Sequence, residues 1–79
     1  MGEARWMLTM GREGGVAIRV QDVAGRVVRE ITKGHMEAGE HAIAWNGTDE
    51  DGKRVGAGVY FLSVEGPDLD LKRRVVLVR

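Results

Sequence analysis

The chain has 79 residues, no cysteine, and twelve basic side chains balanced by twelve acidic ones, so its formal net charge is zero. This length allows one small domain, and the balanced charge argues against partners such as nucleic acid or an anionic membrane surface. The longest apolar run falls far short of the ~20 residues of a membrane-spanning helix, and no disulfide can stabilise the fold. We expect a single domain over residues 1–79 without membrane insertion.

Alternating apolar and polar side chains predict a succession of short strands, and no stretch shows a helical period. The clearest strand has Val16, Ile18 and Val20 on one face and polar side chains on the other. Twelve glycines against one proline fit many tight turns between such strands. The expected strands cover residues 6–10, 16–21, 26–31, 41–45, 59–65 and 71–78, with a short extended piece at Val55.

The first turn with a clear signature lies between the second and third expected strands. Asp22 begins a type I turn that Gly25 closes with a positive φ, and the aspartate can accept hydrogen bonds from its own turn. In the following strand, Val28 and Ile31 are three residues apart rather than two or four. This spacing predicts a β-bulge.

The segment from Trp45 to Phe61 is the most informative of the chain. It indicates a strand end, a polar turn over residues 46–52, a glycine-rich bend and a new strand. Its residues organise backbone and carry no catalytic group. The residues that we expect to define this structural motif, together with the earlier turn, are Asp22, Gly25, Trp45, Gly47, Asp49, Gly52, Gly58 and Tyr60.

These elements predict an all-β fold, an Ig-like (fibronectin III-like) antiparallel β-sandwich of about seven short strands. The core should come from the inward-facing members of each strand. We expect it to contain Leu8, Val16, Ile18, Val20, Val28, Ile31, Ile43, Trp45, Tyr60, Leu62, Val64, Val75 and Leu77.

No catalytic or metal-binding set can be assembled from the remaining polar residues. No hydroxyl side chain lies in a nucleophile elbow, and neither His35 nor His41 has metal ligands at a suitable spacing. The polar turn lacks the glutamate of a calcium loop, because Gly58 stands six residues after Gly52. We expect no enzyme, no metal site and no cofactor. A minor calcium- or carbohydrate-binding module using Asp49, Asp51 or Trp6 stays as the last alternative.

Several motifs together resemble one family of bacterial domains. Residues 18–29 (IRVQDVAGRVVR) resemble its hydrophobic strand followed by Asp-x-x-Gly-Arg, and residues 38–41 resemble its Ala-Gly-x-His. Residues 45–52 resemble its Trp-Asp-Gly-x-Asp-x-x-Gly, with Asn46 in place of the usual aspartate, and residues 58–60 resemble its Gly-x-Tyr. The chain is thus similar, over about residues 5–79, to the FlgD-type Ig-like domains. These include the Ig-like domain of the flagellar hook-capping protein and the C-terminal sorting domains of type IX secretion.

The resemblance implies a non-catalytic C-terminal domain of a secreted or cell-surface bacterial protein, located outside the cell as part of a larger chain. It would act in sorting, anchoring or docking through strand edges and loops. Its partner would be a protein: the secretion machinery, a domain of the parent protein, or copies of itself. The alternative is a building block that self-assembles in an extracellular appendage. For partner recognition we expect the basic residues of the closing strand, Lys72, Arg73, Arg74 and Arg79.

Overall fold

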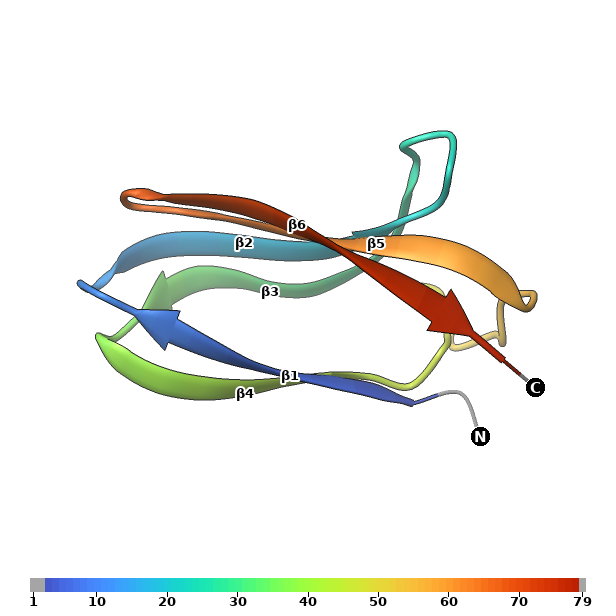
Figure 1. Ribbon diagram of the computed structural model, residues 1–79, viewed down its shortest axis with the longest axis horizontal. Coiled ribbons are helices and arrows are strands. Elements are labelled where there is room, and N and C mark those ends of the chain that lie inside the picture. The colour runs from blue at the N-terminus through green and yellow to red at the C-terminus, as the bar shows by residue number, and fades with distance from the viewer. Residues whose placement is uncertain (1–2, 79) are drawn as a thin grey trace.

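The computed structural model describes residues 3–78 as six antiparallel strands in two layers (Figure 1). One layer has the strand order β1-β4 and the other has the order β3-β2-β5-β6. The predicted all-β sandwich is therefore confirmed. The strands are β1 (Ala4–Met10), β2 (Gly14–Gln21), β3 (Val27–Met36), β4 (Gly39–Trp45), β5 (Gly58–Gly66) and β6 (Leu69–Leu77).

The extended piece expected around Val55 does not add a full strand. Within the described residues it contributes an isolated bridge between Thr48 and Arg54, inside the connection that carries the chain from β4 in one layer to β5 in the other. The six strands and this bridge account for the expected count of about seven. Within the connection, Gly47 and Gly52 each have a φ of 79°, in the left-handed region that turns rather than strands use.

Strand β2 lies in the centre of the larger layer and is hydrogen-bonded to β3 on one side and β5 on the other. Its alternation places Ile18 and Val20 fully inside the sandwich. The other members of the core come from the remaining strands by the same period of two. The buried apolar side chains are Leu8, Met10, Val16, Ile18, Val20, Ile43, Trp45, Leu62, Val64, Val75 and Leu77.

The predicted core differs from the observed one at four positions. Met10 is buried although it was not expected in the core, because the alternation of β1 continues to the last residue of that strand. Val28, Ile31 and Tyr60 are half-buried and pack against the core from its margin. Val28 and Ile31 belong to β3, which is an edge strand, and Tyr60 directs its hydroxyl outward to a loop carbonyl.

The bulge predicted in β3 is present, and it occurs twice. The register with β2 shifts between Ile18 and Arg19 and again between Val20 and Gln21, and the residues left out of the pairing are Ile31 and Val28. The strand does not end at Ile31, as expected, but continues to Met36. Gly34, which lies beyond the end of the expected strand, stays in the sheet opposite Val16 with a φ of 149°, a conformation open mainly to glycine.

The hairpin between β5 and β6 is tighter than the sequence suggested. Gly66 pairs with Leu69, so that Pro67 and Asp68 alone form the loop, and Asp68 has a φ of 56°. Strand β6 accordingly begins at Leu69 instead of Leu71, and it ends at Leu77 instead of Val78. Proline followed by a positive φ is the pattern of a type II turn.

Candidate interaction site

Two turns of identical design lie at one end of the sandwich. In the first, the carboxylate oxygen Oδ1 of Asp22 accepts the backbone N–H groups of Ala24 at 2.9 Å and Arg26 at 3.0 Å. The N–H of Gly25 donates to the carbonyl of Asp22 at 3.0 Å, and Gly25 has a φ of 85°. These contacts confirm the predicted turn, in which the aspartate satisfies the backbone and glycine supplies the left-handed residue.

The second turn repeats this pattern 27 positions later. Oδ1 of Asp49 accepts the N–H groups of Asp51 at 2.9 Å and Lys53 at 3.0 Å, while Gly52 donates to the Asp49 carbonyl at 3.0 Å with a φ of 79°. The shared signature is Asp-x-x-Gly followed by a basic residue. Sequence reasoning identified each turn separately but missed that they are copies.

The charged state of the first aspartate is stabilised by its turn. The pKa of Asp22 lies below its ordinary value, chiefly because its carboxylate accepts the Arg26 N–H. Burial opposes this effect and is the second-largest influence on the pKa, while the Ala24 N–H and the Arg26 guanidinium, 3.1 Å from Oδ2, lower the pKa further. The carboxylate is therefore used by its own turn.

A shallow groove brings the two turns together. It is lined by Asp22 and Arg26 from the first turn, by Asp49 to Asp51 from the second, and by the apolar side chains of Val27, Val28 and Val55. Within residues 3–78, no group of three histidine or acidic side chains is arranged to hold a metal ion. Oδ1 of Asp22 and Oδ1 of Asp49 each accept two backbone donors, so the geometry serves turn structure.

Arg29 of β3 anchors the second turn to the sheet. Its Nη1 donates to Oγ1 of Thr48 at 3.1 Å and to the carbonyl of Asp49 at 2.7 Å, and its Nε lies 3.7 Å from Oε1 of Glu50. Glu50 in turn accepts the backbone N–H of Glu30 through Oε2 at 3.1 Å. A side chain of the loop thereby satisfies a donor on the edge strand β3. This role of Arg29 was missed, since alternation in a strand does not reveal a loop partner.

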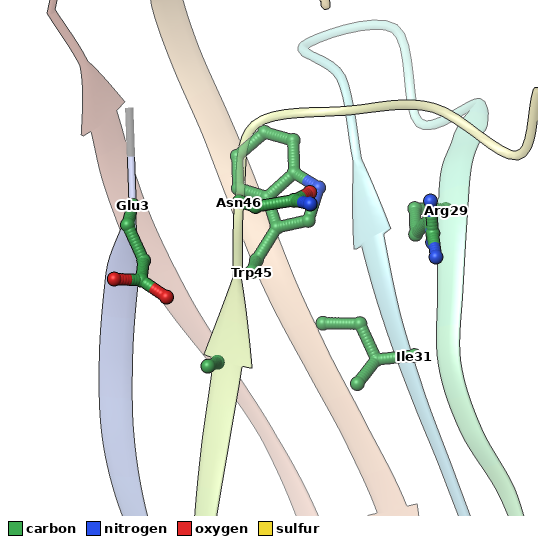
Figure 2. Close-up of a pocket in the computed structure, with 6 residues that line it drawn as sticks. Glu3, Arg29, Ile31, Trp45 and Asn46 are labelled. Carbon is green, nitrogen blue, oxygen red and sulfur yellow. The ribbon is translucent and has the colours of Figure 1, made fainter. Parts of the chain in front are cut away.

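Trp45 holds the same loop from the opposite layer. Figure 2 shows Trp45 and Asn46 at the end of β4 facing Arg29 and Ile31 of β3, around a pocket of about 350 Å³. The indole N–H of Trp45 donates to the Thr48 carbonyl at 2.8 Å. The pocket therefore lies where the connection crosses between the two layers.

Tyr60 completes this cluster from the start of β5. Its ring packs edge-to-face against Trp45, with centroids 5.3 Å apart and planes at 63°, and its hydroxyl donates to the Gly56 carbonyl at 2.6 Å. The structure thus brings Trp45, Gly47, Asp49, Gly52 and Tyr60 into one loop assembly. This assembly holds the crossover between the two layers in place.

The basic residues of the closing strand do not form one patch. Lys72 and Arg74 point to the outer face of the larger layer, opposite Ser63 and Phe61, whereas Arg73 pairs with Leu62 and points toward the space between the layers. Arg79 lies outside the described residues. A strand's period of two separates any three consecutive side chains in this way.

The outer face of the four-stranded layer is divided into a charged and an apolar part. In the charged part, Arg19 lies 3.5 Å from Glu30 and 3.4 Å from Glu65. At the other end of this face, Val59 of β5 pairs with Val76 of β6. In the neighbouring row, Gln21 of β2 lies between its two cross-strand partners, Val27 of β3 and Phe61 of β5. We call this set, Val27, Val59, Phe61 and Val76, the outer apolar patch. Val76 is 58% exposed and Val27 is 51% exposed.

The outer apolar patch combines one aromatic ring, that of Phe61, with three valines, and Arg74 borders it as the cross-strand neighbour of Phe61. Aromatic residues and arginine are enriched where proteins bind one another.

Among residues 3–78 no helix is long and apolar enough to cross a membrane.

Comparison with known protein families gives a match that covers most of the chain. The family model described as the FlgD Ig-like domain matches residues 6–70. This interval includes both Asp-x-x-Gly turns, Arg29, Trp45 and Tyr60. It therefore covers the whole loop assembly described above.

Individual proteins give the same result. The basal-body rod modification proteins FlgD of Salmonella typhimurium and Salmonella typhi are each 37% identical to the chain over 49 residues. This match covers 62% of the chain but 21% of each relative, so the chain spans about a fifth of their length. The crystal structure of FlgD from Xanthomonas campestris, described as giving insights into hook capping essential for flagellar assembly, is 29% identical with a TM-score of 0.71. That likeness covers 95% of this chain and 55% of that one.

Proposed function

Because this chain belongs to the FlgD Ig-like domain family, we propose that it is a non-catalytic structural module of bacterial flagellar assembly, and that it packs against other protein subunits outside the cell. The observation that carries the proposal is the likeness of nearly the whole sandwich to a hook-capping protein. Other copies of the same chain are the partner that we favour. On this proposal the domain is exported as part of a larger protein.

The distribution of polar groups supports a structural role. The side chains that would be the first candidates for chemistry, Asp22 and Asp49, bond to their own turns, and Arg29 bonds to the loop beside it. Among the described residues, no buried side-chain nitrogen or oxygen lacks a hydrogen-bond partner. Groups held for catalysis are commonly left partly unsatisfied or strongly perturbed, so their full use here favours a scaffold.

The outer apolar patch supports packing between subunits. It leaves Val76 and Val27 more than half exposed on a flat sheet face, next to a row of paired charges that could fix the register of a partner. Burial of such side chains contributes roughly 25 cal/mol per Å² of apolar surface. Paired charges at the border add orientation more than affinity.

The sorting interpretation, in which a secretion machine recognises the domain, stays a prediction that we favour less than packing between subunits. It requires Lys72, Arg73, Arg74 and Arg79 to act as one recognition surface. Arg73, however, points away from its two neighbours. The likeness to FlgD favours the appendage building block over recognition by a secretion machine.

Light scattering over a wide concentration range tests the proposal. We expect the mass of the purified chain to rise above the 8.7 kDa of a monomer as its concentration increases. The variant Val76→Lys should stay monomeric, because a lysine in the patch introduces a charge that association would have to bury.

The matched control is Met7→Lys, which places the same charge at a 64% exposed position on the two-stranded layer. This variant should associate like the unmodified chain. A monomer at every concentration, or equal effects of the two lysines, would refute association through the outer apolar patch.

A further inference from the structure

The two layers of the sandwich are unequal, and the smaller one has a free edge at β1. Within residues 3–78, β1 is paired with β4 alone, while the opposite layer has four strands ending in β6. Figure 1 shows these two strands beneath the larger layer. A free strand edge presents unpaired N–H and C=O groups, which can hydrogen-bond to a further strand.

An apolar cavity opens beside this edge. It is lined by Trp6, Met7 and Leu8 of β1 and by Ile43 of β4 on one side. Leu62, Val64 and Leu71 of β5 and β6 line the other side. On the inward face of β6, Val75 and Leu77 are buried, whereas Leu71 is half-buried and Arg73 is exposed where they line this cavity. We call this space, together with the edge of β1, the β1–β6 seam.

Arg73 places a cation in the seam. It follows Leu71 and precedes Val75 on the inward face of β6, and it lines the cavity with the apolar side chains. Among the described residues, its guanidinium donates to the carbonyl of the adjacent Lys72 at 3.3 Å and has no carboxylate within salt-bridge distance. Other arginines with inter-element roles, such as Arg19 and Arg29, each have an acidic partner.

We propose that the β1–β6 seam is an acceptor site for one extended peptide segment, which hydrogen-bonds to β1 and carries apolar side chains at alternate positions with an acidic side chain facing Arg73. The bound segment would add a third strand to the smaller layer. Its backbone gives affinity through the β1 edge, and its inward side chains give specificity, as in other cases of strand addition. The acidic residue matches Arg73, because arginine binds a carboxylate through two parallel hydrogen bonds.

The cavity of the seam favours the side chains of a single segment over a folded partner, because its volume is about 80 Å³. The smaller layer has two strands and the larger layer has four, and Leu71 and Arg73 of β6 line the cavity beside β1. A lone strand that pairs with β1 would bring its inward side chains to this cavity. The site is independent of the outer apolar patch, which lies on the opposite face of the larger layer.

A fusion protein tests the site directly. We would attach a seven-residue strand, the length of β1, ahead of the full chain through a short Gly/Ser linker, with valine, glutamate and valine at its inward positions and threonine elsewhere. The linker supplies a high effective concentration, so weak intrinsic binding is still detected. Amide hydrogen exchange should slow by about tenfold or more for the β1 amides that face away from β4.

A charge exchange identifies the role of Arg73. In Arg73→Glu the protection of β1 should be lost, and it should return when the glutamate of the fused strand is replaced by lysine. Arg74→Glu is the matched control, because this neighbour faces the outer surface and should leave the protection unchanged. Both arginines are exposed, so neither variant removes a core residue.

Two results would overturn the proposal. The first is that the β1 amides of the fusion with glutamate exchange hydrogen as fast as those of the unfused chain. This result would show that the β1 edge does not accept a strand. The second is an equal loss of β1 protection in Arg73→Glu and Arg74→Glu, which would show that Arg73 does not select an acidic residue in the bound segment. Association through the outer apolar patch is measured separately by light scattering, so failure of one proposal is distinguished from failure of the other.

Discussion

Asp22 and Asp49 occupy equivalent positions in two copies of one turn, and each carboxylate accepts two backbone N–H groups at 2.9 and 3.0 Å. One copy joins β2 to β3 within a layer, and the other lies in the crossover between the layers. The same turn conformation therefore serves two different connections between strands. Its defining feature is the glycine that closes each turn.

The glycine that closes the first turn should resist substitution because of its backbone conformation. Gly25 has a φ of 85°, and no atom lies near the position that a Cβ would occupy, so Gly25→Ala should lower the free energy of unfolding by about 1–2 kcal/mol through backbone strain alone. Urea denaturation measures the change. Gly11→Ala is the control: it also has open space but is not in the left-handed region, and it should be neutral or stabilising by up to ~1 kcal/mol. Equal losses in the two variants would contradict this explanation.

Asp22 should make stability depend on acid pH. Its pKa in the folded chain is lower than the ordinary value of 3.8 that applies to the unfolded chain, so the charged form stabilises the fold. This contribution is present above that ordinary value and is lost as the pH falls through the lower folded pKa. Thermal melts between pH 2 and about pH 5 should show a shallower acid decline for Asp22→Asn than for the unmodified chain. The same change at exposed Asp70 is the control, and equal flattening there would argue against Asp22 as the source.

Gly14 and Pro67 should be coupled by a steric contact. A Cβ at position 14 would lie 2.5 Å from Cγ of the proline ring, so Gly14→Ala should destabilise the fold by roughly 1–3 kcal/mol through overpacking. The neighbouring Gly15→Ala has nothing within 4 Å and should cost much less. Combining Gly14→Ala with Pro67→Ala should recover part of the loss in a double-mutant cycle. Purely additive effects would mean that the ring is not the obstacle.

Arg29 should matter for the shape of its guanidinium as well as for its charge. Lysine keeps the charge but cannot reach Thr48, Asp49 and Glu50 with the same set of donors, so Arg29→Lys should cost about 1–2 kcal/mol in chemical denaturation. Arg54→Lys, at an exposed position of the same connection, should stay within ~0.5 kcal/mol. A negligible effect at Arg29 would show that the contacts of Trp45, Tyr60 and Glu50 hold the loop without it.

Local patterns predicted the strands and the turn chemistry well. The alternation of β2 placed Val16, Ile18 and Val20 in the core, and the Asp22 turn formed with Gly25 at positive φ. Both inferences rest on neighbours in the sequence, which determine side-chain direction and allowed φ. The ends of β3 and β6 were less predictable, because Gly34 and Leu69 are held in strands by their partners across the sheet.

The arrangement of the layers was beyond the reach of these patterns. The alternation of side chains along a strand predicts that Arg73 and Leu71 share a face, but it does not predict whether another strand covers that face. For the same reason Lys72, Arg73 and Arg74 were expected as one recognition surface, although the strand separates them. The partners of Arg29 lie about 20 residues away along the chain, and no local rule specifies such a contact.

The position of β2 in the middle of the larger layer also constrains how the chain acquires its fold. Its second ladder needs β5, whose partners for residues 17–21 are residues 61–65. A chain emerging from a ribosome or an export channel therefore cannot complete its central pairing until more than three quarters of its length is free, and pairings so distant in sequence are slow to form. Until then β2 can pair with β3 alone, so the larger layer stays incomplete through most of the domain's own emergence.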